Sequence, residues 1–122
     1  GVLDWEMATI GDPLMDVGNS LAYWIEADDE GPFQMLRRQP THRPGMLTRK
    51  EVVAYYMEQS GFKVDNFDFY EIYGLFRLAV IIQQIYYRFY HGQTKDKRFA
   101  AFGHAANYLE KRCQRLIAES SL

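Results

Sequence analysis

The sequence feature that most constrains the fold is one long apolar segment, NFDFYEIYGLFRLAVIIQQIYYRFYH, which ends just before Gly92. It contains no proline, and the glycine that follows it is a typical helix stop signal. At about 1.5 Å per residue, the segment predicts a helix of roughly 37 Å. Its middle, LFRLAVII, is apolar nearly all round, which predicts a helix that neighbouring elements cover on most sides. We therefore expect this helix, running from about residue 65 to 91, to form the spine of the domain.

Three other segments carry helix signals. Asp12 and Pro13 suit the N-cap and first position of a helix that runs to about Glu26. Thr48 and Glu51 form a capping box that opens a helix of about twelve residues, which Gly61 closes. From about residue 95 to 119, apolar side chains recur every three or four residues and predict a helix that packs along one face. These residues are Phe99, Phe102, Ala106, Leu109, Cys113 and Leu116.

These segments predict a mainly α fold of about four main helices behind a short N-terminal strand, GVLD, with residues 1–122 forming one domain. The proline-containing stretch 32–47 is expected to be a surface loop with one short helical turn near Phe33. A chain of 122 residues is long enough to bury one modest core. We expect no structural metal, because the three histidines are too scattered for a zinc motif.

Charge and hydropathy exclude several classes of partner. The net charge of −2 argues against a nucleic-acid or anionic-membrane binder, which would usually carry a basic bias. The most apolar run, LAVII, is far shorter than the roughly 20 residues that a membrane span needs. The single cysteine, Cys113, excludes an intrachain disulfide, fits a reducing cytoplasm, and lies in the last apolar stripe, so we expect it to be buried and inert.

The first sixteen residues contain four acids, and Asp4 directly follows an apolar trio. A carboxylate at the end of a buried strand is held rigidly and can serve Mg²⁺, which prefers hard oxygen ligands. On spacing alone, a structural role for Asp4, in which it ends the strand and caps the next turn, is the simpler interpretation.

The segment LDWEMATIGDPLMDV resembles the signature of the aminoglycoside phosphotransferase-like family, a branch of the protein-kinase-like fold. The helical remainder is similar to a subgroup that includes the kinase-like domains attached to some large acyl-CoA dehydrogenases. The resemblance implies that Asp4 is the ligand of Mg²⁺ bound with ATP, and that Asp12 and Asp16 are structural acids of the following helix. Val17 stands where the family more often has leucine.

The family's His-Gly-Asp catalytic segment and its nucleotide-binding lobe are missing from these 122 residues. His91-Gly92-Gln93 follows the metal motif and ends a helix, so we interpret it as a helix C-cap. We therefore expect the chain to be the C-terminal helical part of a kinase C-lobe, a fragment that is inactive alone. We also expect it to self-associate through the apolar face that the missing half would cover.

Several charged residues remain open to two interpretations. The acidic run Asp28, Asp29 and Glu30 fits a solvated loop better than a substrate cleft. Arg37, Arg38 and Arg43 fit solvent-exposed loop positions better than contacts to an anionic substrate. Arg77 lies inside the apolar helix, where burial requires a partner. A pair with Asp16 or Glu71 is the simpler role for Arg77, and a substrate anchor is the alternative.

Two functions from different classes are consistent with the sequence. The first is a small-molecule kinase that transfers phosphate from ATP to a hydroxyl group, with Mg²⁺ at Asp4. The second is a non-catalytic helical binding module, in which the acids serve only as helix caps and the aromatic-rich helices hold a partner.

Overall fold

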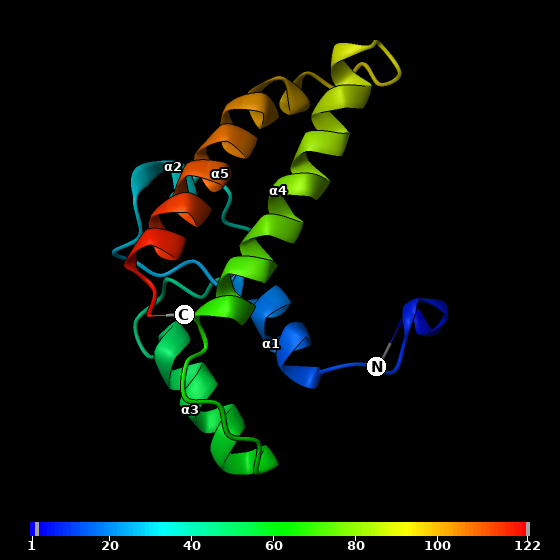
Figure 1. The fold of residues 1–122 in the computed structure, drawn as a ribbon. Coiled ribbons are helices and arrows are strands. Elements are labelled where there is room, and N and C mark those ends of the chain that lie inside the picture. The colour runs from blue at the N-terminus through cyan, green and yellow to red at the C-terminus, as the bar shows by residue number, and fades with distance from the viewer. Residues whose placement is uncertain (2, 122) are drawn as a thin grey trace.

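The computed structural model describes Gly1 and residues 3–121 (Figure 1). Its elements, in chain order, are η1 (Trp5–Met7), α1 (Pro13–Leu21), α2 (Gly31–Gln34), α3 (Arg49–Ser60), α4 (Asp68–Tyr90), η2 (Lys97–Ala101) and α5 (Phe102–Glu119). The predicted mainly α class is confirmed, as are the four main helices. None of the helices in the described residues is both long enough and apolar enough to cross a membrane.

The core lies where α4 and α5 pack side by side as a hairpin, with α1 on another side of α4 (Figure 1). Asn66 accepts a hydrogen bond from the backbone N–H of Asp68 at the start of α4, and Gly92, with φ of 69°, follows its end. The predicted stripe on the last helix is confirmed at its centre. The buried residues that join the two helices are Leu75, Leu78 and Ile82 of α4 and Ala106, Leu109 and Cys113 of α5.

Two glycines let the backbones of α1 and α4 come into direct contact. A Cβ atom added to Gly18 would lie 2.1 Å from the carbonyl oxygen of Tyr70, and one added to Gly74 would lie 2.0 Å from that of Gly18. No side chain fits such a contact without a shift of the helices. The absence of a side chain at Gly18 therefore sets how closely α1 and α4 pack.

The first helix ends at Leu21 rather than near Glu26, and the chain then turns across the bundle. Ile25 and Phe33 from this crossing segment are both 1% exposed and belong to the core. The buried hydroxyl of Thr41 donates to the carbonyl of Ile25 at 2.8 Å, which ties the proline-rich loop to the same segment. The turn after Leu21 therefore leads to residues that join the core.

The prediction of an N-terminal strand at residues 1–4 is wrong for the residues of this segment that the structure describes, which exclude Val2. Asp4 directly precedes the short η1 turn, and no strand occurs among the described residues. A strand needs a pairing partner, and none of the described segments offers one.

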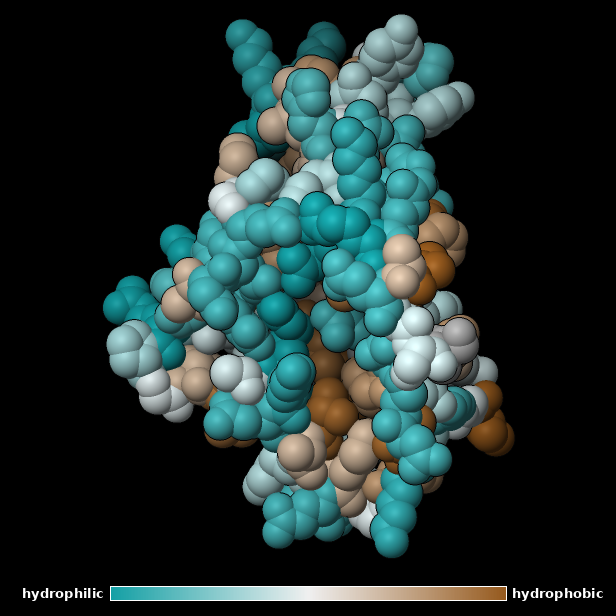
Figure 2. Space-filling view, turned by 60° about the vertical axis from the view of Figure 1, so that its left-hand side comes forward, coloured by the Kyte–Doolittle hydropathy of each residue, from teal (hydrophilic) through white to brown (hydrophobic). Residues whose placement is uncertain are grey.

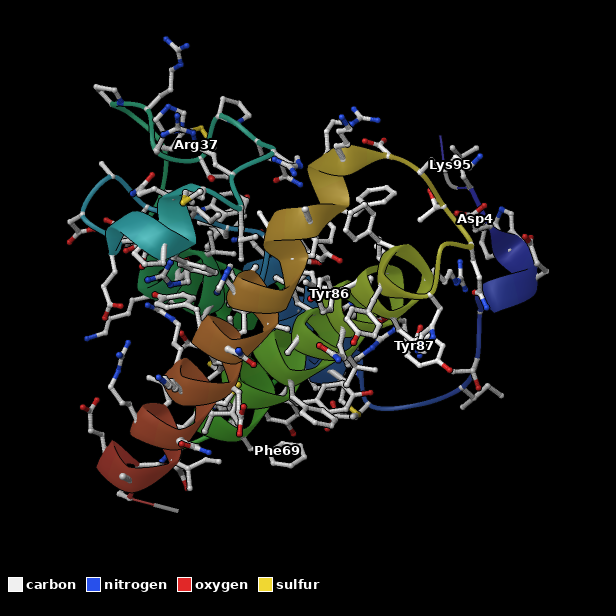
Figure 3. All side chains as sticks on the ribbon, turned by 90° about the horizontal axis from the view of Figure 1, so that it is seen from above. Asp4, Arg37, Phe69, Tyr86, Tyr87 and Lys95 are labelled. Atoms are coloured by element: carbon white, nitrogen blue, oxygen red, sulfur yellow. The ribbon has the colours of Figure 1, made fainter. Side chains whose placement is uncertain are left out.

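The expectation that neighbours cover most of the long helix is also wrong. Phe69, Phe76 and Tyr87 are each more than half exposed along one face of α4, and Figure 3 shows Phe69 pointing away from the bundle.

The capping box predicted for α3 is present in full. The Thr48 hydroxyl accepts from the N–H of Glu51, and the Glu51 carboxylate accepts from the N–H of Thr48. Gly61 ends the helix with φ of 75°. Nonetheless α3 has no buried residue, and Figure 1 shows it projecting from the bundle below the α4–α5 pair.

Candidate functional site

Asp4 lies on an N-terminal arm that stands away from the helical bundle (Figures 1 and 3). Its side chain is exposed, and it makes no capping hydrogen bond to the η1 turn. Its backbone has φ of 58° and ψ of 42°, so among the described residues it is the one non-glycine residue at positive φ. Such left-handed conformations are strained for most residues, are tolerated best by Asp and Asn, and cluster at functional sites.

Asp12 joins this arm to the bundle. Its Oδ1 accepts from the N–H of Leu14 at 2.9 Å, which confirms the predicted N-cap of α1. Its Oδ2 accepts from the hydroxyl of Tyr70 on α4 at 2.7 Å, and this hydrogen bond raises the pKa of Tyr70. Asp16 is exposed in the first turn of α1, where a negative charge suits the helix dipole.

The side chain of Asp4 suits the role of one ligand of a magnesium ion. Its two carboxylate oxygens are hard donors on an exposed turn. Mg²⁺ commonly takes one or two protein carboxylates and completes its shell with phosphate oxygens and water. The described residues contain no group of three or more His, Cys, Asp or Glu side chains that could hold a metal by themselves. Retention of the ion would therefore depend on a bound phosphate.

A second charged group, which we call the Asp29 cluster, lies in the bundle and consists of Asp29, Arg49 and Arg112. Arg49 donates to both carboxylate oxygens of Asp29 at 2.6 and 2.9 Å, and Arg112 donates to the same carboxylate at 3.2 Å. The Asp29 side chain is only 4% exposed. The ring of Phe33 lies against both guanidinium groups, with its centre 4.5 Å from the Arg112 Cζ.

The cluster joins three parts of the chain that are distant in sequence. Asp29 follows α1, Arg49 begins α3 and Arg112 lies on α5. Arg49 also donates to the carbonyl of Trp24 at 2.9 Å and lies 3.6 Å from the Glu26 carboxylate and 3.9 Å from that of Glu71. The Arg49 side chain therefore ties the first turn of α3 to several points of the bundle.

Burial alone would raise the pKa of Asp29. Two hydrogen bonds, from Arg49 and from the backbone N–H of Glu26, outweigh that effect, together with the positive charges of Arg49 and Arg112. The pKa of Asp29 is therefore lowered. Asp29 is thus held ionised in the folded state. Burial raises the pKa of the Cys113 thiol, which agrees with the expectation that this cysteine is inert.

The structure corrects two predictions about charged residues. Asp29 is not part of a solvated loop, although its neighbour Asp28 is exposed. Arg77 is exposed and pairs with neither Asp16 nor Glu71; its guanidinium lies 5.9 Å from the centre of the Tyr73 ring. Arg37, Arg38 and Arg43 are exposed as expected, and Figure 3 shows Arg37 at the opposite edge of the molecule from Asp4.

Sequence reasoning missed the roles of Arg49 and Arg112. One signal for Arg112 was present, because it lies three residues after Leu109 and four before Leu116, and therefore borders the apolar stripe of α5. Arg49 carries no comparable signal, since its partner Asp29 is 20 residues away and belongs to a run of acids that is typical of solvent-exposed loops.

Comparison with known proteins confirms the resemblance drawn from the acidic motif. Residues 1–52 match the family model described as the phosphotransferase enzyme family. This match covers Asp4, Asp12, Asp16 and the whole of α1, and it indicates a kinase-like phosphotransferase.

The chain is also similar to much longer curated proteins. It is 38% identical over 78% of its length to acyl-CoA dehydrogenase family member 10 of Mus musculus, covering 9% of that protein. It is 30% identical over its whole length to the probable acyl-CoA dehydrogenase IBR3 of Arabidopsis thaliana, covering 15% of it. Mouse acyl-CoA dehydrogenase family member 11 is 30% identical over 79% of the chain, which covers 12% of that protein.

The chain therefore spans no more than 15% of the length of these three relatives. The dehydrogenase activity in their names describes those whole proteins and is not transferred to this chain. No solved structure gives a significant match.

Proposed function

We propose that this chain is the C-terminal helical part of an ATP- and Mg²⁺-dependent phosphotransferase that acts on a hydroxyl group of a small molecule. The observation that carries the proposal is the exposed carboxylate of Asp4, held in a left-handed conformation within the segment that matches the phosphotransferase family. The short spans matched in the relatives support assigning the ATP-binding lobe and the catalytic acid to other parts of the protein.

In the proposed reaction, the acceptor oxygen forms a bond to the γ-phosphorus of ATP while the bond to the β–γ bridging oxygen breaks, ADP leaves, and a base outside these 122 residues takes the hydroxyl proton. Mg²⁺ would neutralise charge on the phosphate oxygens. Asp4 would hold that ion, and Asp12 would fix the arm against α4 through Tyr70. Such catalysis is mainly positioning and charge neutralisation, so the loss of one carboxylate should be severe.

The proposal is tested by Asp4→Asn in the complete protein that contains this sequence. We expect Mg²⁺-dependent phosphoryl transfer to fall at least 100-fold, equivalent to about 2.7 kcal/mol of transition-state stabilisation. We also expect calorimetry to show weaker binding of ATP in the presence of Mg²⁺ and unchanged binding in EDTA. Asp65→Asn, at an exposed position before α4, is the matched control and should alter neither quantity.

Unchanged turnover of the Asp4→Asn protein would show that Asp4 is not a metal ligand. Phosphoryl transfer by the 122-residue chain alone would contradict the assignment of the catalytic residues to other parts of the protein. A thermal-shift screen of acceptors with ATP would identify the substrate, because a ligand at 100 times its Kd adds about 2.7 kcal/mol of stability. We also propose a cytoplasmic location, which the presence of only one cysteine in these 122 residues fits.

A further inference from the structure

Helix α3 lies over a pocket of about 600 Å³ where the end of α1, the start of α4 and the end of α5 meet. The pocket wall is mainly apolar, and the side chains that give it this character are Leu21, Val53, Met57, Phe67 and Leu116. On the face that Figure 2 turns toward the viewer, apolar surface is recessed between hydrophilic side chains. The size and lining are those of small-molecule sites in general.

The charged groups around this pocket are largely engaged with one another. Three acids and three bases line it: Glu26, Asp68, Glu71, Arg49, Lys50 and Arg112. Arg49 and Arg112 both contact Asp29, and the carboxylate of Asp68 accepts from the hydroxyl of Ser120 at 2.7 Å. Because most of these charges are paired within the protein, the pocket offers no strong preference for an anion or a cation. Its chemistry favours an uncharged apolar body.

The attachment of α3 is confined to its first turn. The Arg49 side chain reaches Asp29 and the carbonyl of Trp24, the backbone N–H of Arg49 donates to Glu26, and the Trp24 indole N–H donates to the carbonyl of Leu47 at 2.8 Å. From residue 50 to 60, no hydrogen bond or ion pair joins α3 to α1, α4 or α5 among the described residues. The far end of α3 therefore lacks the polar contacts that hold its first turn.

We propose that this pocket binds a small molecule with an uncharged apolar body, and that α3 is a lid that pivots on the Asp29 cluster and closes over it. Closure would bury the surface that partly buried apolar side chains of α3, including Val53 and Met57, still expose. That burial supplies the driving force, at about 25 cal/mol per Å² of apolar surface. The site does not depend on the phosphotransferase assignment, because neither Asp4 nor ATP contributes to it.

The test uses N-phenyl-1-naphthylamine, an uncharged apolar dye that fluoresces when it leaves water, titrated into the chain. We expect saturable binding of one equivalent. Val53→Asp places a charge on the pocket wall and should weaken binding at least tenfold. Val80→Asp makes the same change on the groove between α4 and α5, outside the pocket, and should leave binding within twofold.

Both variants keep the core, since α3 has no buried residue and Val80 is 38% exposed. Ala54→Phe is a second variant that fills the pocket without adding charge, and it should also weaken binding at least tenfold. Absence of saturable binding, unchanged binding in the Val53→Asp and Ala54→Phe chains, or equal loss in Val80→Asp would overturn the site.

The lid is tested separately by hydrogen exchange with and without the dye. Without it, amides in residues 53–60 should exchange at least tenfold faster than those in the centre of α4. Dye at saturation should slow the exchange in residues 53–60 at least threefold. Equal protection of α3 and α4 in the free chain, or no slowing with dye, would refute the lid.

Discussion

Replacement of Arg49 by methionine tests whether the Asp29 cluster stabilises the fold. Methionine keeps the apolar stem and removes the charge, so that Asp29, which is 4% exposed, loses two hydrogen bonds of 2.6 and 2.9 Å. The carbonyl of Trp24 loses its donor as well. The change therefore leaves a buried carboxylate with only one of its two cationic partners.

The magnitude follows from what remains. Removal of one partner from a buried ion pair costs about 3–5 kcal/mol, because the other charge stays in a poorly solvated place. Arg112 still lies 3.2 Å from Asp29 and compensates part of its charge. We therefore expect the free energy of unfolding to fall by about 3 kcal/mol, the lower end of that range.

Urea unfolding followed by circular dichroism measures this loss as a shift in the midpoint at constant slope. The matched control is Arg98→Met, because Arg98 also pairs with an aspartate, Asp96 at 2.5 Å, but its side chain is 84% exposed. Solvent and salt screen such a pair, so the control should leave the midpoint within experimental error. A loss for Arg49→Met below about 1 kcal/mol would refute the reasoning, since it would show that Asp29 is already well solvated.

Three further outcomes are expected. Because the pKa of Asp29 is lower in the folded state than its unfolded value of about 3.9, Asp29 adds stability above that pH, and this stability is lost as the pH falls through the folded pKa. The difference in urea midpoint between the wild-type chain and Arg49→Met should therefore narrow below about pH 4, and a constant difference would contradict this. Gly74→Ala should lower the free energy of unfolding by about 2 kcal/mol or more, because the added methyl group meets the backbone of α1. Gly31→Ala, at an exposed position, should leave the free energy of unfolding unchanged, and equal effects of the two changes in thermal unfolding would disprove the close contact. The 122-residue chain should self-associate through the exposed face of α4 and less so as Phe76→Asp; a monomer in sedimentation at micromolar concentration would argue against it.

The sequence predicted several helix caps well because their signals are local. Asp12 with Pro13, Thr48 with Glu51, and Gly61 or Gly92 at positive φ all act on residues within four positions of themselves. The structure confirms each of these caps. The end of α1 was misplaced because apolar residues continue past Leu21, and two of them, Ala22 and Ile25, reach the core from the segment that follows the helix.

The sequence failed where the outcome depends on distant partners. Nothing near Asp29 shows that it meets Arg112, which follows 83 residues later. The all-round apolar pattern of α4 predicted burial on every side, yet only Gly74, Leu75, Leu78 and Ile82 are buried within that helix. Periodicity reports how many faces are apolar, but the positions of other segments decide which of them are covered.

The same distinction explains the candidate site. Asp4 could be named from its motif because the side chain's chemistry and its neighbours in sequence are sufficient to suggest a magnesium ligand. The arm that bears Asp4 meets the bundle at Asp12, whose two carboxylate oxygens serve different partners: Oδ1 caps α1 and Oδ2 accepts from Tyr70 on α4. The first interaction is local and was predicted. The second spans 58 residues and was not, although it is the contact that connects the arm bearing Asp4 to the helix at the centre of the fold.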